Sequence, residues 1–413
     1  MRIHGHGLGA DFKSAMQRRV INEFPMAMTT SVHGHENGAK RLSICVVHPS
    51  ENAHSETFIR QHIERLPARS IYGGPWPTWY SNGTPLMRQR LLMKGIGLLA
   101  TRFLNLPPER FSQRAFARYL RREAIDVVLA EYGPTGVAVR DCCHDAGVPL
   151  VVHFHGYDAH SIPVLEEYRE GYRQLFAAAA AVIAVSRTME KQLLSLGVPN
   201  EKLFLNSCGV DVDGLKRASP AFVKPEFLAV GRFVDKKAPH LTLLAFAKVV
   251  ETCPGAHLTM VGEGPLLDCC KQLVAALGIT ESVEFTGALR HERVQALMAG
   301  ARAFVQHSVR TTYGDCEGTP VAVLEASATG LPVVSTKHAG IQEAIIHQRT
   351  GFLVAERDVN GMADYMSQLA ADSALAAALG TAGRRFVSQY YSAENSIGRL
   401  FDILQKAVVH GQR

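Results

Sequence analysis

The chain has 413 residues, of which 47% are hydrophobic and 20% charged; this is long enough for two domains with separate cores and excludes disorder over most of the length. The formal net charge of +6 is modest, and the eight cysteines include two adjacent pairs but no C-x-x-C. This pattern excludes a disulfide framework and a zinc-type spacing, and it favours a reducing compartment. No apolar run reaches about 18 residues, so we expect neither a transmembrane helix nor a signal-peptide core.

The first periodic elements are a strand and a helix. Residues 1–40 are rich in glycine, histidine and polar residues, and we expect a poorly ordered extension there. The apolar run 42–47 predicts a buried parallel strand, and 58–66 has a helical pattern. Because Ser55 or Thr57 can cap this helix, its N-terminus should lie at the carboxyl end of the strand, where open α/β sheets bind ligands.

Residues 86–122 are predicted to be helical, apolar and strongly basic, with Glu109 as the only acidic residue. Such a segment suits an anionic membrane surface, where each basic residue near the headgroups is worth about 1 kcal/mol. The alternative is a solvated helical face whose apolar side packs on the core. Nucleic acid is less favoured, because no binding motif is present. The basic residues are Arg88, Arg90, Lys94, Arg102, Arg110, Arg114, Arg118, Arg121 and Arg122.

Strands and helices then alternate, as a parallel sheet requires. Strands are predicted over 126–130, 150–154, 181–185 and 203–206, and helices over 137–146, 164–176 and 187–196. Ser186 is the predicted cap of the last helix. His155 follows a strand and precedes Gly156, where a backbone and a ligand can approach closely, so it is a candidate site residue. We interpret His153, inside the strand, as structural.

The alternation restarts after a polar, glycine-containing linker near residues 206–220. Strands are predicted over 227–233, 257–261, 283–287, 303–306, 333–336 and 351–354, and helices over 241–250, 294–299, from 338, and throughout 360–409. Gly262 and Gly264 follow a strand, but the third glycine and the later acid of a dinucleotide fingerprint are missing. We therefore predict a tight turn with a nucleotide nearby.

The stretch 317–325 places two carboxylates around a predicted helix start. Thr319 is a good N-cap, and Pro320 suits the first helical position. A helix start of this kind offers free backbone N–H groups and the positive end of a dipole, both of which suit a diphosphate. Glu317 should then lie in the loop before the helix and Glu325 on its second turn, with Gly330 as a left-handed C-cap.

Three of these motifs together resemble one family. They are Gly231-Arg232 with Lys237 five residues after the arginine, Val261-Gly262-Glu263-Gly264-Pro265, and the E-x7-E motif from Glu317 to Glu325 continuing to Thr336. Residues 227–392 closely resemble the nucleotide-binding half of the family 4 retaining glycosyltransferases. The resemblance implies an α/β GT-B fold, in which two Rossmann-like parallel-sheet domains face each other across a cleft.

Three further segments, two of them in the amino half, resemble a narrower branch, the enzymes that build exopolysaccharides such as colanic acid. The matching segments are Ser55-Glu56-Thr57-Phe58, the His153-x-His155-Gly156 loop, and residues 315–320. Two departures stand out. A longer polar loop, 48–54, replaces the glycine pair that many members have after the first strand, which affects acceptor contacts. Ala238 replaces the glycine that commonly follows the lysine.

The resemblance implies domain limits and roles for residues. The expected parts are an acceptor-side domain over 41–215, a nucleotide-sugar domain over 216–391, and a helix over 392–413 that returns to the first domain. The implied catalytic group is Glu317, Arg232, Lys237 and His155, with His155 as a positioning or polarising residue. The implied donor-binding residues are Glu325, Gly231, Gly262, Gly264, Gly287, Gly318, Thr319 and Pro320.

The implied reaction moves a hexose from a UDP- or GDP-sugar to a glycan or a polyprenyl-diphosphate-linked acceptor, in the cytoplasm or at the inner membrane face. Arg232 and Lys237 can stabilise the departing diphosphate, so no metal cofactor is expected. The triplet Asp211-Val212-Asp213 resembles the metal-binding pair of other sugar transferases, but such triplets are common. The alternatives are a non-catalytic sugar-nucleotide-binding partner in an assembly complex and a sugar-nucleotide 2-epimerase.

Overall fold

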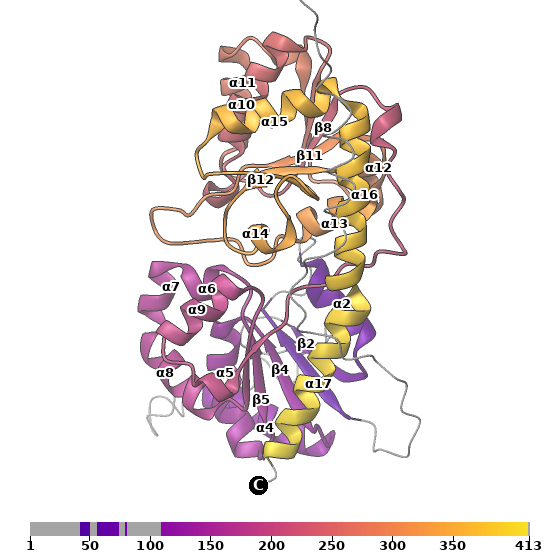
Figure 1. Cartoon of the computed structure of the whole chain (residues 1–413). Helices are drawn as coiled ribbons and strands as arrows, with labels where there is room; N and C mark the ends of the chain where they lie inside the picture. Colours follow the sequence, from indigo (N-terminus) through magenta and orange to yellow (C-terminus); the bar gives the residue numbers. More distant parts are fainter. Residues whose placement is uncertain (1–41, 50–55, 74–78, 81–108, 412–413) are drawn as a thin grey trace, which may run out of the picture. The chain divides into compact units, whose positions relative to one another are not determined.

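The computed structural model describes residues 42–49, 56–73, 79–80 and 109–411. The predictions for residues 1–40, for the cap at Ser55, and for the basic residues before 109 lie outside these ranges. The described residues form two separate sheets with helices packed on them, which confirms the α/β class (Figure 1).

The first sheet has seven strands in the order β3-β2-β1-β4-β5-β6-β7. Among the strands that the structure describes in this sheet, only the short β3 runs antiparallel to its neighbour. The strands are β1 (Ile44–His48), β2 (Ala68–Gly73), β3 (Trp79–Tyr80), β4 (Val127–Glu131), β5 (Leu150–His153), β6 (Ala181–Ala184) and β7 (Leu203–Leu205). The sequence predicted five of them, because their apolar runs are buried on both faces of a parallel sheet. It did not predict β2 and β3.

The helices around this sheet differ from the prediction in two places. The predicted helix 164–176 is interrupted at Tyr168, and a short helix, α6, was not predicted. Ser186 does cap α9, because its hydroxyl accepts the Met189 N–H at 3.2 Å. Thr57 is the first residue of α2 and not its cap. The helices are α2 (Thr57–Arg65), α4 (Glu109–Arg122), α5 (Gly133–Ala146), α6 (Tyr157–His160), α7 (Ile162–Glu167), α8 (Arg169–Ala178) and α9 (Arg187–Ser195).

The second sheet has six parallel strands in the order β10-β9-β8-β11-β12-β13. The strands are β8 (Glu226–Val230), β9 (His257–Val261), β10 (Val283–Gly287), β11 (Ala303–Gln306), β12 (Val333–Thr336) and β13 (Gly351–Val354). This is the doubly wound order. Successive strands are added on one side of β8 up to β10, and the chain then crosses to the other side, where β11 lies next to β8. Ligands of such sheets bind beyond the carboxyl ends of the strands at this reversal point of the strand order.

Short helices connect these strands. They are α10 (Pro239–Thr252), α11 (Leu267–Ala276), α12 (His291–Gly300), α13 (Val321–Thr329) and α14 (Ile341–Ala344). The sequence analysis missed α11. Gly330 ends α13 in the left-handed conformation, with φ 92°, as predicted.

The tail is helical, as predicted, but it is divided into α15 (Val359–Ala371), α16 (Ser373–Tyr390) and α17 (Ala393–Gly411). The Asp372 carboxylate starts α16 by accepting the Leu375 N–H at 2.8 Å. Leu400 and Leu404 of α17 are fully buried in a cluster with Ile44 and Leu129 of the first sheet. The last helix therefore forms part of the core of the first sheet.

The apolar side of α4 is also part of a core. Phe116 and Leu120 are fully buried, whereas Arg114 and Arg118 are exposed. This is the packing that the solvated-face alternative predicts. None of the helices that the structure describes is long and apolar enough to cross a membrane.

Candidate active site

The turn after β8 places Arg232 and Lys237 at the reversal point of the second sheet. A short 3-10 helix, η3 (Asp235–Lys237), and then α10 follow the turn. Between them, Ala238 has the left-handed conformation, with φ 38° and ψ 52°. A glycine adopts this conformation without strain, which is consistent with the glycine that the family resemblance led us to expect at this position.

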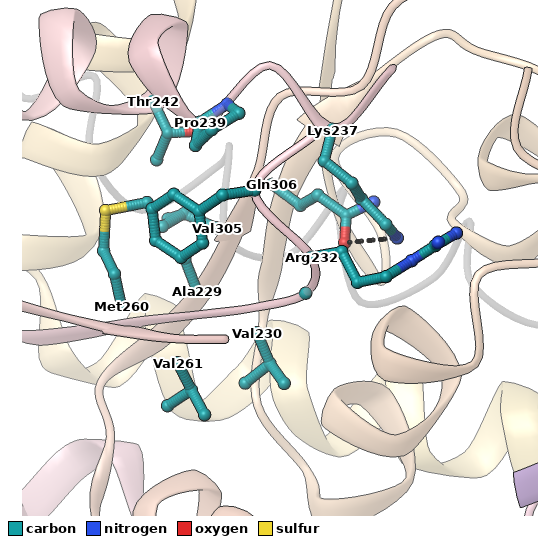
Figure 2. A pocket seen from close by; sticks show the side chains of 12 residues that line it. Ala229, Val230, Arg232, Lys237, Pro239, Thr242, Met260, Val261, Val305 and Gln306 are labelled. Atoms are coloured by element: carbon teal, nitrogen blue, oxygen red, sulfur yellow. Dashed lines mark hydrogen bonds between the residues drawn. The ribbon is translucent and has the colours of Figure 1, made fainter. Parts of the chain in front are cut away.

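Lys237 and Glu317 form the central ion pair. The Lys237 Nζ lies 3.1 Å from Glu317 Oε1 and donates to Gln306 Oε1 at 3.3 Å. Both partners are largely enclosed, with side chains 17% and 7% exposed. Figure 2 shows Lys237, Gln306 and Arg232 pointing toward one side of the pocket. The structure thus brings together three of the four predicted catalytic residues.

Glu317 is held in its ionised form. Burial by itself raises the pKa of this carboxyl, but the charges of Lys237 and Lys236 outweigh it and hold the pKa below its ordinary value. Lys236 itself donates to Asp315 Oδ1 at 3.1 Å. Because its neighbours are cationic, Glu317 can accept hydrogen bonds from sugar hydroxyls at neutral pH.

Arg232 is exposed and makes no ion pair with any residue that the structure describes. Its guanidinium is therefore available to an anion, and its planar donor fork matches phosphate geometry. Arg232 is one of the residues that line a pocket (Figure 2). The pocket is lined by Ala229, Val230, Gly231, Arg232, Phe233, Lys237, Pro239, Thr242, Met260, Val261, Val305 and Gln306.

Gly262 and Gly264 pack the turn after β9 against the turn after β8. A Cβ on Gly262 would lie 2.0 Å from the Gly231 carbonyl oxygen, and one on Gly264 would lie 2.5 Å from that of Phe233. The two turns also exchange backbone hydrogen bonds, such as Phe233 N–H to the Glu263 carbonyl at 2.9 Å. These glycines shape the pocket by close backbone packing. Gly287 ends β10 and accepts the Gly262 N–H at 2.9 Å.

The start of α13 differs from the prediction at Thr319. The N-cap position belongs to Pro320, and the helix begins at Val321. The Thr319 hydroxyl instead donates to the Val185 carbonyl, at the end of β6, at 2.6 Å. Capping was therefore the wrong role, because a contact distant in sequence takes the hydroxyl. The segment still leads into a helix N-terminus.

Gly318 sits where two loops touch. A Cβ at this position would lie 1.9 Å from the His155 carbonyl oxygen and 2.9 Å from a methyl group of Val185. Only glycine fits this contact. It brings the backbone of the predicted His155-Gly156 loop directly against the loop that carries Glu317.

Glu325 lies on the second turn of α13, as predicted, in a partly buried position. Burial raises the pKa of its carboxyl to about 7. At neutral pH the group is close to half ionised, and it can both donate to and accept from a hydroxyl pair such as that of a ribose.

The imidazole of His155 is buried under its loop. Its side chain is 4% exposed, and its Nε2 donates to Glu131 Oε2 at 2.6 Å. The ring also packs on Phe58, with centroids 4.3 Å apart. Burial lowers the pKa of His155, but interactions with Cys208 and Glu131 outweigh it and raise the pKa to about 10. The ring is therefore protonated at neutral pH and cannot accept a proton.

Glu131, which the sequence analysis did not single out, binds both His155 and His62. Its fully buried carboxylate pairs with His62 Nδ1 at 2.6 Å. Burial alone raises the pKa of Glu131, but the charge of His62 and the hydrogen bond of His155 hold it well below its ordinary value. The sequence did contain a signal for this role, because Glu131 is a charged residue at the end of the otherwise apolar strand β4.

His62, Glu131 and His153 are also the donor types that bind transition metals, and all three are buried. The His62 to Glu131 separation of 2.6 Å is shorter than the roughly 3.3 Å that two ligands of one tetrahedral zinc ion keep. We therefore interpret the cluster as a hydrogen-bonded network. His153 is fully buried within it, beyond the reach of a ligand.

Asp158 holds the His155 loop in place. Its carboxylate accepts the N–H groups of His155 at 3.0 Å, Gly156 at 2.8 Å and Gly133 at 3.0 Å.

The first aspartate of the D-x-D triplet, Asp211, lies in a surface turn. Asp211 pairs with Arg65 at 2.6 Å and accepts the Gly214 N–H at 3.1 Å, so its oxygens serve this turn.

The strand ends of the second sheet thus combine an exposed guanidinium, an ammonium–carboxylate pair, a helix N-terminus and a carboxyl group with a raised pKa. Cationic groups and backbone N–H groups bind phosphates, and carboxylates bind hydroxyl groups. A ligand with a diphosphate between two hydroxyl-bearing ends fits this set of groups.

Comparison with known proteins gives two family matches. The family described as "Glycosyl transferases group 1" matches residues 213–386, and the one described as "Glycosyltransferase Family 4" matches residues 81–213.

Curated relatives carry descriptions of the same kind. A putative colanic acid biosynthesis glycosyltransferase of Salmonella typhimurium is 30% identical over 286 residues, covering 68% of this chain and 70% of the relative. The Escherichia coli protein of the same description is 34% identical over 250 residues, covering 59% of this chain and 61% of the relative. That second match spans less than two thirds of the relative's own length.

A solved structure supports the architecture. The Anabaena protein HepE, crystallised with UDP and glucose, superposes with a TM-score of 0.68 at 17% identity, covering 88% of this chain and 99% of its own. At this identity the likeness concerns the fold alone, which is the GT-B fold.

Proposed function

The chain belongs to the family 4 glycosyltransferases, and from this premise we propose that it is a retaining hexosyltransferase using a UDP- or GDP-sugar. The acceptor in this proposal is a glycan or lipid-linked oligosaccharide of cell-surface polysaccharide synthesis. The observation that carries the proposal is the Lys237–Glu317 ion pair beside the exposed Arg232, at the carboxyl ends of β8 and β11.

The diphosphate of the donor would bind Arg232, Lys237 and the start of α13. When the glycosidic bond breaks, negative charge develops on the leaving diphosphate and positive charge on the anomeric carbon. Fixed cations beside the leaving oxygen lower this barrier. Two side chains supply that charge here, so the proposal requires no metal cofactor.

Glu317 would accept hydrogen bonds from hydroxyls of the donor sugar, and Glu325 would bind the ribose. Retention follows if the acceptor attacks from the face that the diphosphate leaves, with a phosphate oxygen taking the acceptor proton. The raised pKa of His155 supports a positioning role for that residue, because a protonated ring cannot act as a base.

We place the enzyme in the cytoplasm, peripherally bound to the inner membrane face. The exposed arginines of α4 support this placement, because they lie on the side of the helix opposite to the core. A polyprenyl-diphosphate acceptor would be presented at that surface.

A donor screen tests the proposal directly. The purified protein is mixed with UDP-, GDP- and ADP-sugars, and thermal unfolding is recorded; a donor at 100 times its dissociation constant adds about 2.7 kcal/mol. Stabilising donors are then incubated with and without acceptor extracts. We expect transfer with retention of anomeric configuration. Isomerisation without acceptor would indicate an epimerase, and binding without turnover would indicate a non-catalytic partner.

Glu317→Gln separates chemistry from binding. We expect turnover to fall at least about 100-fold, because the carboxylate interacts with the reacting sugar, while UDP or GDP binds nearly as well as before. Calorimetry with the free nucleotide and single-turnover kinetics measure the two effects. Glu292→Gln, on the exposed face of α12, is the matched control. An equal loss of nucleotide affinity in Glu317→Gln would contradict the assigned role.

A further inference from the structure

Glu317 sits in a long loop without regular structure. Residues 307–320 connect β11 to α13 and contain neither helix nor strand. The position of the Glu317 carboxylate therefore depends on side chains that hold this loop.

His338, just after β12, makes the direct contact with Glu317. Its Nε2 lies 3.1 Å from the Glu317 backbone nitrogen, and its Nδ1 lies 2.6 Å from Glu356 Oε1. The His338 side chain is 2% exposed. Neither contact was anticipated from the sequence, because the contacts join residues that are 21 and 18 positions apart and no motif relates them.

The chemistry of the two partners fixes the tautomer of His338. A backbone N–H can only donate, so Nε2 must accept from Glu317. Nδ1 then carries the ring proton and donates it to Glu356. The carboxylate of Glu356 thus keeps the lone pair of Nε2 directed at the loop.

Glu356 also holds the loop at a second point. Its Oε2 accepts the Arg310 N–H at 2.9 Å. The next residue, Arg357, donates its own N–H to His307 Nε2 at 2.8 Å. The loops that follow β11, β12 and β13 are therefore tied together beside the ion pair of Glu317.

We propose that His338 is a positioning residue that fixes the Glu317 backbone for sugar transfer, and that Glu356 sets the tautomer it needs. This inference rests on the proposed function, in which the Glu317 carboxylate binds the donor sugar. When the N–H of Glu317 loses its acceptor, the loop relaxes and the carboxylate leaves its 3.1 Å contact with Lys237.

Two substitutions separate the roles of the two ring nitrogens. The oxygen of a glutamine can occupy the place of Nε2, so His338→Gln keeps an acceptor for the Glu317 N–H. An asparagine reaches only the place of Nδ1, so His338→Asn keeps the contact with Glu356 and loses the one with Glu317. Both variants remove the ring, which makes each the control of the other.

We expect His338→Asn to lower kcat at least tenfold while the KM for the donor changes less than threefold, and His338→Gln to stay within about threefold of the native kcat. Hydrogen exchange followed by mass spectrometry provides a readout that does not depend on activity. The peptide that contains residues 315–320 should exchange faster in His338→Asn than in His338→Gln.

The outcomes distinguish this inference from the proposed function. Equal kcat and equal exchange in the two variants would overturn the positioning role, because the loss of the ring would then be the only effect. Faster exchange in His338→Asn with native kcat would also overturn it. If the native protein transfers no sugar, the proposed function fails, while the exchange comparison still decides whether His338 holds the loop.

Discussion

Glu317 and Glu325 lie on one short segment, yet their carboxyl groups respond to burial in opposite ways. Lysine charges hold the pKa of Glu317 below its ordinary value, whereas no such charge offsets the burial that raises the pKa of Glu325 to about 7. The first group is thus a fixed anion, and the second changes its charge near neutral pH. The difference supports assigning the sugar to one and the ribose to the other.

The raised pKa of Glu325 predicts a pH-dependent effect on stability. The folded protein binds the proton of the Glu325 carboxyl more tightly than the unfolded chain does. The proton therefore stabilises the folded state at low pH, and this stabilisation is lost as the pH rises through about 7. Glu325→Gln should therefore raise the free energy of unfolding by about 1–2 kcal/mol at pH 8, and by much less at pH 5.

Denaturant unfolding at both pH values measures this effect, with Glu292→Gln as the exposed control. Nucleotide affinity gives a second test, because ribose hydroxyls bind the ionised carboxylate better. In the native protein the affinity should fall as pH drops below 7, and in Glu325→Gln this dependence should disappear. A gain in stability that is the same at both pH values would contradict the assignment.

At the residue scale, the motifs identified residues that lie close together in the structure, but not the side chains that hold them in place. The family resemblance named Arg232, Lys237 and Glu317 as site residues, and the structure brings them together. Glu131 and His338 were not found, because each acts through contacts between residues that are distant in sequence and that no spacing reveals. Thr319 was given the wrong role for the same reason, since its partner Val185 is distant in the chain.

At the element scale, most strands and helices followed from periodicity, because buried parallel strands read as apolar runs. The missed elements had weaker local signals. The strand β2 contains charged and polar residues, and α6 is only four residues long. The packing of α17 on the first sheet came from the family resemblance, because helix periodicity does not identify the sheet that a helix covers.

The packing of α17 predicts a large effect at Leu404, which is fully buried against the first sheet. Leu404→Ala should lower the free energy of unfolding by about 2–5 kcal/mol, because it leaves a cavity in the core. Activity per folded molecule should change little, since Leu404 packs in the core of the first sheet, whereas Glu317 pairs with Lys237 beside the second. Val409→Ala removes a 57% exposed side chain from the same helix and should cost less than about 0.5 kcal/mol.

Urea unfolding followed by circular dichroism compares the two variants. Similar losses for Leu404→Ala and Val409→Ala would mean that α17 is not held by its apolar face. A selective loss at Leu404 would instead assign the last helix to the stability of the first sheet.

At the scale of the whole molecule, the distribution of charge matters more than its net value of +6. Helix α4 exposes Arg114, Arg118, Arg121 and Arg122, while its apolar side is covered by the core. Because the core covers the apolar side chains that the structure describes in α4, residues 113–122, we expect membrane binding through this part of the helix to be electrostatic. Such binding depends on anionic lipid and weakens with salt.

Replacing these four arginines with glutamine should therefore reduce cosedimentation with vesicles of phosphatidylglycerol and phosphatidylcholine. Each arginine near the headgroups is worth about 1 kcal/mol, so the affinity should fall at least about tenfold at low salt. A matched control removes the same charge from exposed positions of the second sheet's helices and loops: Lys248, Lys271, Arg290 and Arg293. If both variants lose vesicle affinity equally, the net charge drives the association. If neither variant loses affinity, α4 is a solvated face. The acceptor must then reach the enzyme without help from this helix.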